Sequence, residues 1–239
     1  MPRFFVESIG GNTVVIEGAD ATHIAKSLRM KKGEQITVCD TKGTDYLCEI
    51  ISMGNTVECN ILSSEKSICE PDVNVTLYQA IPKSDKLDTI VQKAVELGVT
   101  RIVPVLTKRC ISRPDKASME KKCERLSKIA FEAAKQSQRG IIPKICSMVD
   151  FSQAVKSMSE DDIGIIFYEG GGERLNEIGL KPEQNISIMV GAEGGFGPDE
   201  VELAVKGGII QAGLGPRILR CETAPLAALS IIMNLTKNM

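Results

Sequence analysis

The pattern of apolar and polar positions changes near residue 70. Before that point, apolar and polar side chains alternate in short runs separated by turn residues such as Gly10-Gly11-Asn12, Lys42-Gly43 and Gly54-Asn55. Alternation of this kind predicts β-strands, and the turns predict hairpins. The predicted strands span residues 4–6, 13–16, 35–39, 46–52 and 56–62. Short, regularly spaced strands favour a small β-barrel, here interrupted by one helix that begins at Asp20.

From residue 73 the pattern changes to strands that alternate with helices. Residues 63–72 are polar and contain a proline, so we predict a linker there. The expected strands are 73–80, 101–106, 141–145, 163–168, 186–190 and 209–214. The expected helices begin after Ser84 and cover 115–138, 150–158, 198–206 and 223–237. This order predicts an α/β domain at 73–239, with a mostly parallel sheet, that follows a β-barrel domain at 1–70.

Composition places the chain among ordinary globular proteins. It has 239 residues, 43% of them hydrophobic, and a mean hydropathy near zero. No apolar run approaches 18 residues and the first residues lack the features of a signal peptide, so we expect no membrane span and a cytoplasmic location. The eight cysteines include no C-x-x-C pair, and His23 is the single histidine. We therefore expect reduced thiols and no metal.

Charge is unevenly distributed although the net charge is only −2. Residues 83–145 carry 15 basic and 7 acidic side chains, whereas residues 146–239 carry 7 basic and 13 acidic ones. A basic band within an acidic chain is typical of a surface that binds a polyanion such as nucleic acid. A pair of lysine-rich, solvated helices would give the same count, and charge alone does not distinguish the two.

Glycine is concentrated in one part of the chain, since 12 of the 21 glycines lie between Gly170 and Gly215. Two glycine-rich turns follow the predicted strands 186–190 and 209–214, and open α/β sheets bind ligands at the carboxyl ends of their strands. The sequence motifs of a Walker A loop, of a dinucleotide-binding loop and of a nucleophile elbow are all absent. Glu193 and Glu222 make the pocket acidic, which favours an adenosyl ligand with a positive centre over a bare polyphosphate.

Two motifs carry a resemblance to a known family. Residues 191–196 (GAEGGF) and 214–224 (LGPRILRCETA) resemble the paired motifs of SPOUT-class RNA methyltransferases. The chain most resembles the ribosomal RNA small-subunit methyltransferase E family, which methylates N3 of a uridine in small-subunit ribosomal RNA. Residues 23–33, 83–99 and 125–139 resemble further motifs of that family. Two departures are visible, since the family usually has proline where Ala192 stands and threonine where Cys221 stands.

The resemblance implies a fold, a cofactor and partners. It implies a PUA-like β-barrel for residues 1–70 and a trefoil-knotted SPOUT domain for residues 73–239. It also implies S-adenosylmethionine as cofactor, small-subunit ribosomal RNA or the assembled subunit as substrate, and a homodimer. The expected cofactor cradle is Gly191, Glu193, Gly194, Gly195, Leu214, Gly215, Ile218, Leu219, Thr223 and Ala224. The alternative for the glycines is that they only make tight turns.

The chemistry implied by the resemblance needs a cation and a proton acceptor. Uridine N3 must lose its proton as it attacks the methyl group, and negative charge then spreads to the flanking carbonyl oxygens. Arg220 is the candidate cation, and Glu222 is the candidate base or the partner that orients Arg220. Glu222 is equally a candidate for stabilising the first turn of the last helix, beside Thr223 as N-cap.

The candidate RNA contacts are cations spread over both predicted domains. Aromatic residues make up only 4% of the chain, so phosphate contacts should dominate and binding should weaken steeply with salt. Two other functions stay open: an RNA-binding assembly factor with a vestigial pocket, and a nucleotide-dependent transferase that acts on a small molecule. The proposed RNA contacts are Arg3, His23, Arg29, Lys83, Lys86, Lys93, Arg125 and Arg139.

Overall fold

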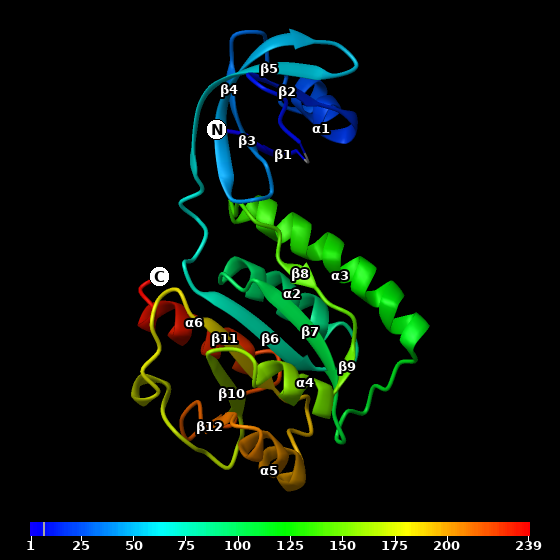
Figure 1. The fold of residues 1–239 in the computed structure, drawn as a ribbon. Helices are drawn as coiled ribbons and strands as arrows, with labels where there is room; N and C mark the ends of the chain where they lie inside the picture. Colours follow the sequence, from blue (N-terminus) through cyan, green and yellow to red (C-terminus); the bar gives the residue numbers. More distant parts are fainter. Residues whose placement is uncertain (7) are drawn as a thin grey trace. The chain divides into compact units, whose positions relative to one another are not determined.

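A computed structural model describes residues 1–6 and 8–239 of the chain. The chain divides into two compact units (Figure 1). Unit 1 is Met1–Glu70 together with Ala134–Ile142, and unit 2 is Pro71–Ala133 together with Pro143–Met239. Each unit is therefore built from two separate stretches of sequence.

Unit 1 is organised by a five-stranded sheet. Its strand order is β1-β3-β4-β5-β2, and the β1–β3 pair is parallel whereas the others are antiparallel. A short helix α1 (Gly18–Thr22) continues into a π-helical turn (His23–Ser27), and Ile24 of that turn is buried in the core. The strands are β1 (Arg3–Phe5), β2 (Thr13–Ile16), β3 (Gln35–Cys39), β4 (Thr44–Met53) and β5 (Val57–Lys66).

Two sequence predictions in unit 1 are wrong in detail. The helix begins after Glu17 rather than at Asp20, because Gly18 adopts a φ of +63° and redirects the chain there. Residues 63–66, predicted as a linker, continue strand β5 instead. They pair with the first residues of β4, in a register that runs to Thr44 opposite Lys66. Polar side chains do not prevent a strand from forming when its backbone has a partner.

The second stretch of unit 1 is held by buried polar groups. The Arg139 side chain is only 2% exposed and pairs with Glu70, at 2.7 Å between Nη2 and Oε2. Glu70 also accepts the backbone N–H groups of Gly140 and Ile141, at 2.7 and 2.9 Å. Gly140 in turn accepts a hydrogen bond from the backbone N–H of Gly43, at 3.2 Å. Arg139 is therefore committed to holding this stretch in unit 1.

The Arg3 side chain is likewise held by contacts inside unit 1. Its guanidinium donates to both oxygens of Asp45, at 2.7 and 2.6 Å, and also to the carbonyl oxygen of Arg139 at 3.1 Å. The two side chains of this ion pair are largely buried. The sequence placed Arg3 and Arg139 among the RNA contacts, but the structure uses both guanidinium groups inside unit 1.

Unit 2 contains a seven-stranded sheet in which every pairing is parallel. Its order is β12-β10-β11-β6-β7-β8, with β9 also paired to β7. The parallel α/β fold predicted from the sequence is thus confirmed. The strands are β6 (Asn74–Ala80), β7 (Arg101–Leu106), β8 (Lys144–Ile145), β9 (Val149–Asp150), β10 (Ile163–Phe167), β11 (Asn185–Val190) and β12 (Ile210–Ala212).

Apolar side chains are buried on both faces of this sheet. Leu77, Ile165 and Ile188 are fully buried on one face, and residues of the opposite parity face the other way. Helix α2 packs against α6. The helices are α2 (Lys86–Glu96), α3 (Lys116–Gln136), α4 (Phe151–Met158), α5 (Pro198–Lys206) and α6 (Ala224–Leu235). One core cluster joins Tyr78, Val103, Ile166 and Met189 to Phe151 and Val155 of α4 and Val201 and Ala204 of α5.

Some element boundaries in unit 2 differ from the prediction. Ser84 does not cap α2, since the N-cap is Asp85 and Ser84 adopts a φ of +56°. The strand expected at 141–145 shrinks to Lys144–Ile145, because residues up to Ile142 belong to unit 1. The short strand β9 was not anticipated, because two residues carry no periodicity.

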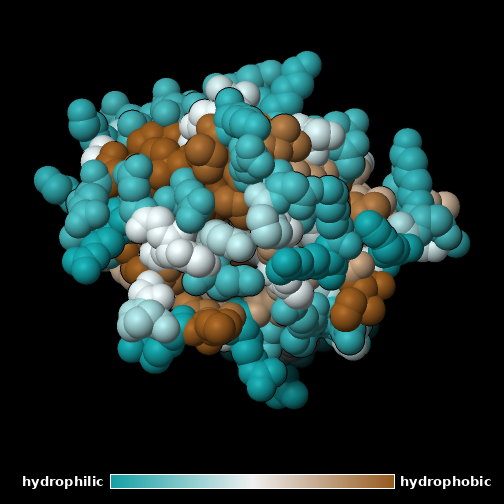
Figure 2. Space-filling model, turned by 90° about the horizontal axis from the view of Figure 1, so that it is seen from below, coloured by the Kyte–Doolittle hydropathy of each residue, from teal (hydrophilic) through white to brown (hydrophobic). Residues whose placement is uncertain are grey.

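The surface mixes polar and apolar side chains. On the face drawn in Figure 2, separate apolar patches lie among mostly hydrophilic residues. Across the described part of the chain, no helix combines the length and hydrophobicity needed to span a bilayer.

Candidate functional site

A cavity of about 520 Å³ lies in unit 2, where the loops that follow β10, β11 and β12 meet. These loops leave the carboxyl ends of neighbouring parallel strands (Figure 1), which is where open α/β sheets bind ligands. The start of α2 and the first turn of α6 complete the wall. The cavity is lined by Lys86, residues 167–171, residues 190–193, Gly195, residues 214–221 and Ala224.

The loop after β11 forms a rigid wall made mostly of backbone. Ala192 and Gly195 form an isolated β-bridge, and Gly195 has a φ of +61°. A Cβ on Gly191 would lie 3.0 Å from the Gly195 Cα, so these two positions approach too closely for side chains. Phe196 anchors the loop, since it is 1% exposed and its ring lies 5.9 Å from that of Phe151. The glycines of this loop therefore do form tight turns, and Gly191 and Gly195 also line the cavity.

The loop after β12 is more open. Gly215 has a φ of +96°, and the carbonyl oxygen of Arg220 accepts the N–H groups of Thr223 and Ala224 at 2.8 and 2.9 Å. This turn leads the chain into α6 and leaves the Arg220 side chain exposed at the cavity. Ile218 also lines the cavity although the residue is 87% exposed. An apolar side chain so placed can cover part of a bound ligand.

Most residues of the predicted cradle lie at this cavity. Gly194 and Thr223 flank it instead. The Gly194 carbonyl accepts a hydrogen bond from Arg109 Nη1 at 3.0 Å, and Thr223 is the N-cap residue of α6 without a side-chain capping bond. The predicted residues that line the cavity are Gly191, Glu193, Gly195, Leu214, Gly215, Ile218, Leu219 and Ala224.

A third wall of the cavity, formed by the loop after β10, was not predicted from the sequence. Residues 167–171 follow β10 and bring Glu169 to the cavity. The Glu169 carboxylate lies against Gly195, where any Cβ would collide with it, and Arg109 Nη1 is 3.8 Å from Glu169 Oε1. The signal was present, because Gly170-Gly171-Gly172 follows the apolar run that forms β10, separated from it only by Tyr168 and Glu169. It is the same arrangement that identified the other two loops.

The Lys86 side chain has ionic partners within the chain that were not expected from the sequence. It was predicted to contact RNA, but its Nζ lies 3.1 Å from Glu193 Oε1 and 3.2 Å from Glu222 Oε2. Hydrogen bonds with Glu193 and Glu222 raise the pKa of Lys86 above its ordinary value. Glu222 thus forms an ion pair with Lys86, whereas Arg220 was predicted as its partner from the sequence.

The two carboxylates next to Lys86 are both ionised. The Cys221 thiol donates to Glu222, and with Lys86 this lowers the pKa of Glu222. Burial opposes ionisation of Glu193, but hydrogen bonds from its own backbone N–H and from Lys86 outweigh it, so the pKa of Glu193 is also lowered. The site therefore combines an acidic pair with three cations, namely Lys86, Arg217 and Arg220.

Cys221 is expected to be unreactive at neutral pH. It is buried, and burial together with the neighbouring Glu222 carboxylate raises the pKa of its thiol to about 12. Because the thiolate is the nucleophile, iodoacetamide at pH 7.5 should label Cys221 far more slowly than the exposed Cys69. Peptide mass spectrometry of the native protein measures both rates. Equal labelling of the two would contradict the setting of Cys221 described above.

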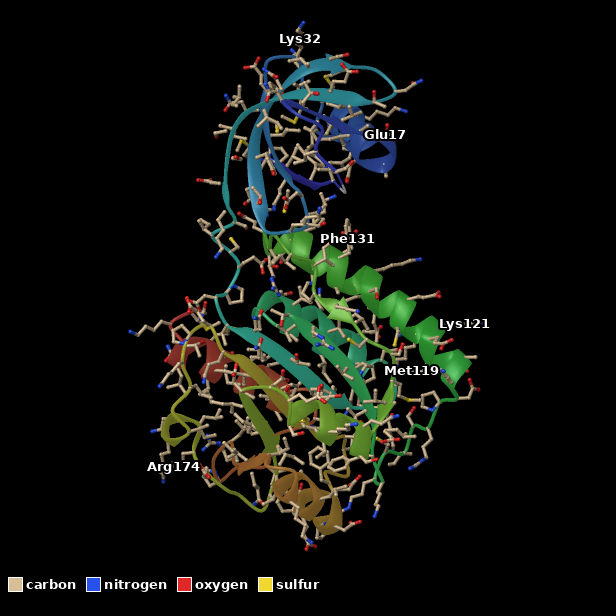
Figure 3. The ribbon with its side chains drawn as sticks, viewed as in Figure 1. Glu17, Lys32, Met119, Lys121, Phe131 and Arg174 are labelled. Atoms are coloured by element: carbon tan, nitrogen blue, oxygen red, sulfur yellow. The ribbon has the colours of Figure 1, made fainter. Side chains whose placement is uncertain are left out.

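The remaining candidate RNA contacts lie in both units. His23 and Arg29 are exposed in unit 1, and Lys83 is exposed in unit 2. Arg125 pairs with Asp88 at 2.8 Å, and Lys93 pairs with Glu96 at 2.8 Å. Helix α3 also presents Lys121, which extends outward in Figure 3. Exposed pairs of this kind contribute little to stability, so these cations can exchange partners.

Two family models match the chain. The model described as an RNA methyltransferase domain matches residues 69–233. The model described as an RNA methyltransferase PUA domain matches residues 16–62.

Individual relatives and solved structures agree with these models. A Bacillus subtilis protein named ribosomal RNA small subunit methyltransferase E is 35% identical, with 97% of this chain and 96% of that protein aligned. The Aquifex aeolicus protein of the same name is 31% identical over 98% of this chain and 100% of its own length. The structure of a ribosomal RNA small subunit methyltransferase E from Neisseria gonorrhoeae bound to S-adenosyl methionine superposes with a TM-score of 0.88. It is 33% identical, covering 99% of this chain and 98% of that one.

Proposed function

The chain belongs to the ribosomal RNA small subunit methyltransferase E family, and we propose that it methylates N3 of a uridine in small-subunit ribosomal RNA. The family establishes an S-adenosylmethionine-dependent methyltransferase that acts on small-subunit ribosomal RNA. The choice of a uridine and of its N3 atom is the finer part of the proposal. It comes from the family resemblance of the sequence motifs, and Arg220 at the cavity and the neighbouring Glu222 are compatible with it.

The cavity suits the cofactor in size and in charge. About 520 Å³ is within the range of small-molecule sites. When bound, S-adenosylmethionine supplies a methyl group on a positively charged sulfur. Gly191, Gly195 and Gly215 give a ligand access to backbone, and Glu169 and Glu193 bring negative charge to the wall. These residues are the proposed cradle, together with Leu214, Ile218, Leu219 and Ala224.

The protein's own residues have two tasks in the proposed reaction. A uracil N3 that forms a bond to carbon must give up its proton, and negative charge develops on the two carbonyl oxygens beside it. Arg220, exposed at the cavity, is the proposed donor that stabilises this charge. Glu222, an ionised carboxylate beside Cys221, is the proposed acceptor for the N3 proton or for the hydrogen bond that orients the base.

The single observation that carries the proposal is the meeting of the cofactor cradle with Arg220 at one cavity. Small-subunit ribosomal RNA that lacks the modification should gain one N3-methyluridine when it is incubated with the protein and S-adenosylmethionine. Mass mapping of the digested RNA identifies both the nucleotide and the methylated atom. A methyl group on ribose or on another base would contradict the uridine N3 assignment, and no methyl group at all would favour a non-catalytic assembly role.

Further proposals concern the roles of the two domains, the knot, the oligomeric state and the location of the protein. We infer that residues 1–70 bind RNA and residues 73–239 carry out the transfer, with His23, Arg29, Lys83, Lys93 and Arg125 as phosphate contacts. The trefoil knot and a homodimer follow from the family resemblance, and a cytoplasmic location follows from the sequence features of the chain. All three remain predictions. The mapping experiment uses free RNA and the assembled subunit in parallel, and the form that gains the methyl group is the substrate.

A further inference from the structure

One lysine connects the two loops that carry the proposed chemistry. Lys86 is the first residue of α2, and its Nζ reaches Glu193 in the loop after β11 and Glu222 in the loop after β12. The Cys221 Sγ atom is a further neighbour of the same Nζ, at 3.7 Å. Two loops from separate strands are thus joined through one ammonium group. The side chain of Lys86 also lines the cavity itself.

The two carboxylates differ in their other contacts. Both oxygens of Glu193 also accept the backbone N–H of Lys83, at 3.2 and 3.3 Å. Glu193 is therefore committed to tying its loop to the segment that precedes α2. By contrast, the recorded partners of Glu222, Lys86 and Cys221, both contact its Oε2 atom. The two contacts leave the Glu222 Oε1 atom for a further donor, and Glu222 directly follows Cys221, which lines the cavity.

We propose that Lys86 is a positioning residue for the methyl transfer, which holds Glu222 as an oriented carboxylate next to the target base. This inference rests on the proposed function of the cavity and adds a residue that acts through another. Lys86 stabilises the ionised form of Glu222 and fixes the orientation of its carboxylate. Because Lys86 also pairs with Glu193, it links Glu222 to the loop proposed to bind the cofactor.

Like charges explain why the site needs this ammonium group. Glu193 and Glu222 both lie within hydrogen-bonding distance of one Nζ, so removal of Lys86 would leave two carboxylates close together. A neighbouring like charge disfavours ionisation and raises a carboxyl pKa, whereas the ammonium group lowers it. Without Lys86 the pair should therefore take up a proton at higher pH. The other charged groups near the site are Lys83, Asp85, Arg109, Glu169, Arg217 and Arg220.

The test compares Lys86→Met with Lys86→Arg. Carbon-13 NMR of glutamate-labelled protein, without RNA or cofactor, follows the titration of Glu222, which is assigned by the loss of its signal in Glu222→Gln. In Lys86→Met the apparent pKa of the Glu193–Glu222 pair should rise by about one unit or more, and Lys86→Arg should restore it. Lys206→Met, which removes an exposed ion pair with Glu202, is the matched control and should leave the titration unchanged.

A second measurement separates this inference from the proposed function. If the protein methylates RNA, the acidic limb of its pH–rate profile should move to higher pH in Lys86→Met and return in Lys86→Arg. A purely structural role would lower the rate equally at every pH. An unchanged Glu222 titration would overturn the inference even if RNA is methylated. Absence of methylation together with a shifted titration would overturn the proposed function, and with it the role of Lys86 in methyl transfer, while the control of Glu222 ionisation by Lys86 would stand. Lys86→Gln gives the same comparison should Lys86→Met fail to fold.

Discussion

The Gly195→Trp protein is expected to lose S-adenosylmethionine binding by more than about 100-fold, equivalent to roughly 2.7 kcal/mol. Gly195 lines the cavity and has a φ of +61°, in the left-handed region that disfavours residues with a Cβ. Any Cβ there would collide with the Glu169 carboxylate, and an indole would also occupy ligand volume. Isothermal titration calorimetry with the purified protein measures the loss.

Gly208→Ala is the control for backbone strain. Gly208 also has a positive φ, +84°, and none of the described residues lies within 4 Å of a Cβ placed there. The substitution adds similar backbone strain away from the cavity, so the protein should be less stable yet bind the cofactor as the wild type does. Circular dichroism verifies that both variants fold. Wild-type affinity in a folded Gly195→Trp protein would remove the loop after β11 from the cofactor site.

The Arg139→Met substitution should destabilise unit 1 by about 3–5 kcal/mol, the usual effect of removing one partner from a buried ion pair. The Arg139 and Glu70 side chains are 2% and 6% exposed, so the Glu70 carboxylate would remain buried without its main counter-charge. Native-state hydrogen exchange of peptides from residues 1–70 gives the free energy of unfolding of this unit.

Two further variants show whether the cause is the orphaned charge. Glu70→Gln in the Arg139→Met background removes that charge while keeping an acceptor for the N–H groups of Gly140 and Ile141. The double variant should therefore be more stable than Arg139→Met alone. Lys206→Met should leave exchange in unit 1 unchanged, because its ion pair with Glu202 is exposed and lies in unit 2. A loss below about 1 kcal/mol in Arg139→Met would contradict a structural role of this size.

Local sequence patterns were sufficient for much of the fold. In α2, Leu87, Ile90, Val91, Ala94 and Val95 follow helical spacing, and all five are buried. The glycine-rich turns after two apolar strands identified the wall of the cavity. These signals are local, since the period of a helix or the turn after a strand can be recognised within a few residues.

The roles of the charged residues depended on tertiary contacts. Arg139 pairs with Glu70, which lies 69 positions earlier in the chain, and Lys86 pairs with Glu222. Counting charges in a window shows that a segment is basic but gives no information about which cations already have a distant partner. For this reason nothing in the sequence indicated that three of the predicted RNA contacts have ionic partners within the chain, two inside unit 1 and one at the cavity.

The division of unit 1 between two stretches of sequence affects the order in which the protein can fold during synthesis. At about 5–20 residues per second, a ribosome needs roughly 4–14 s to proceed from Glu70 to Gly140. During that interval the Glu70 carboxylate has no Arg139, and Gly43 lacks its partner carbonyl on Gly140. The first 70 residues emerge earliest, yet the N-terminal unit can be completed only after the whole of α3 has been translated.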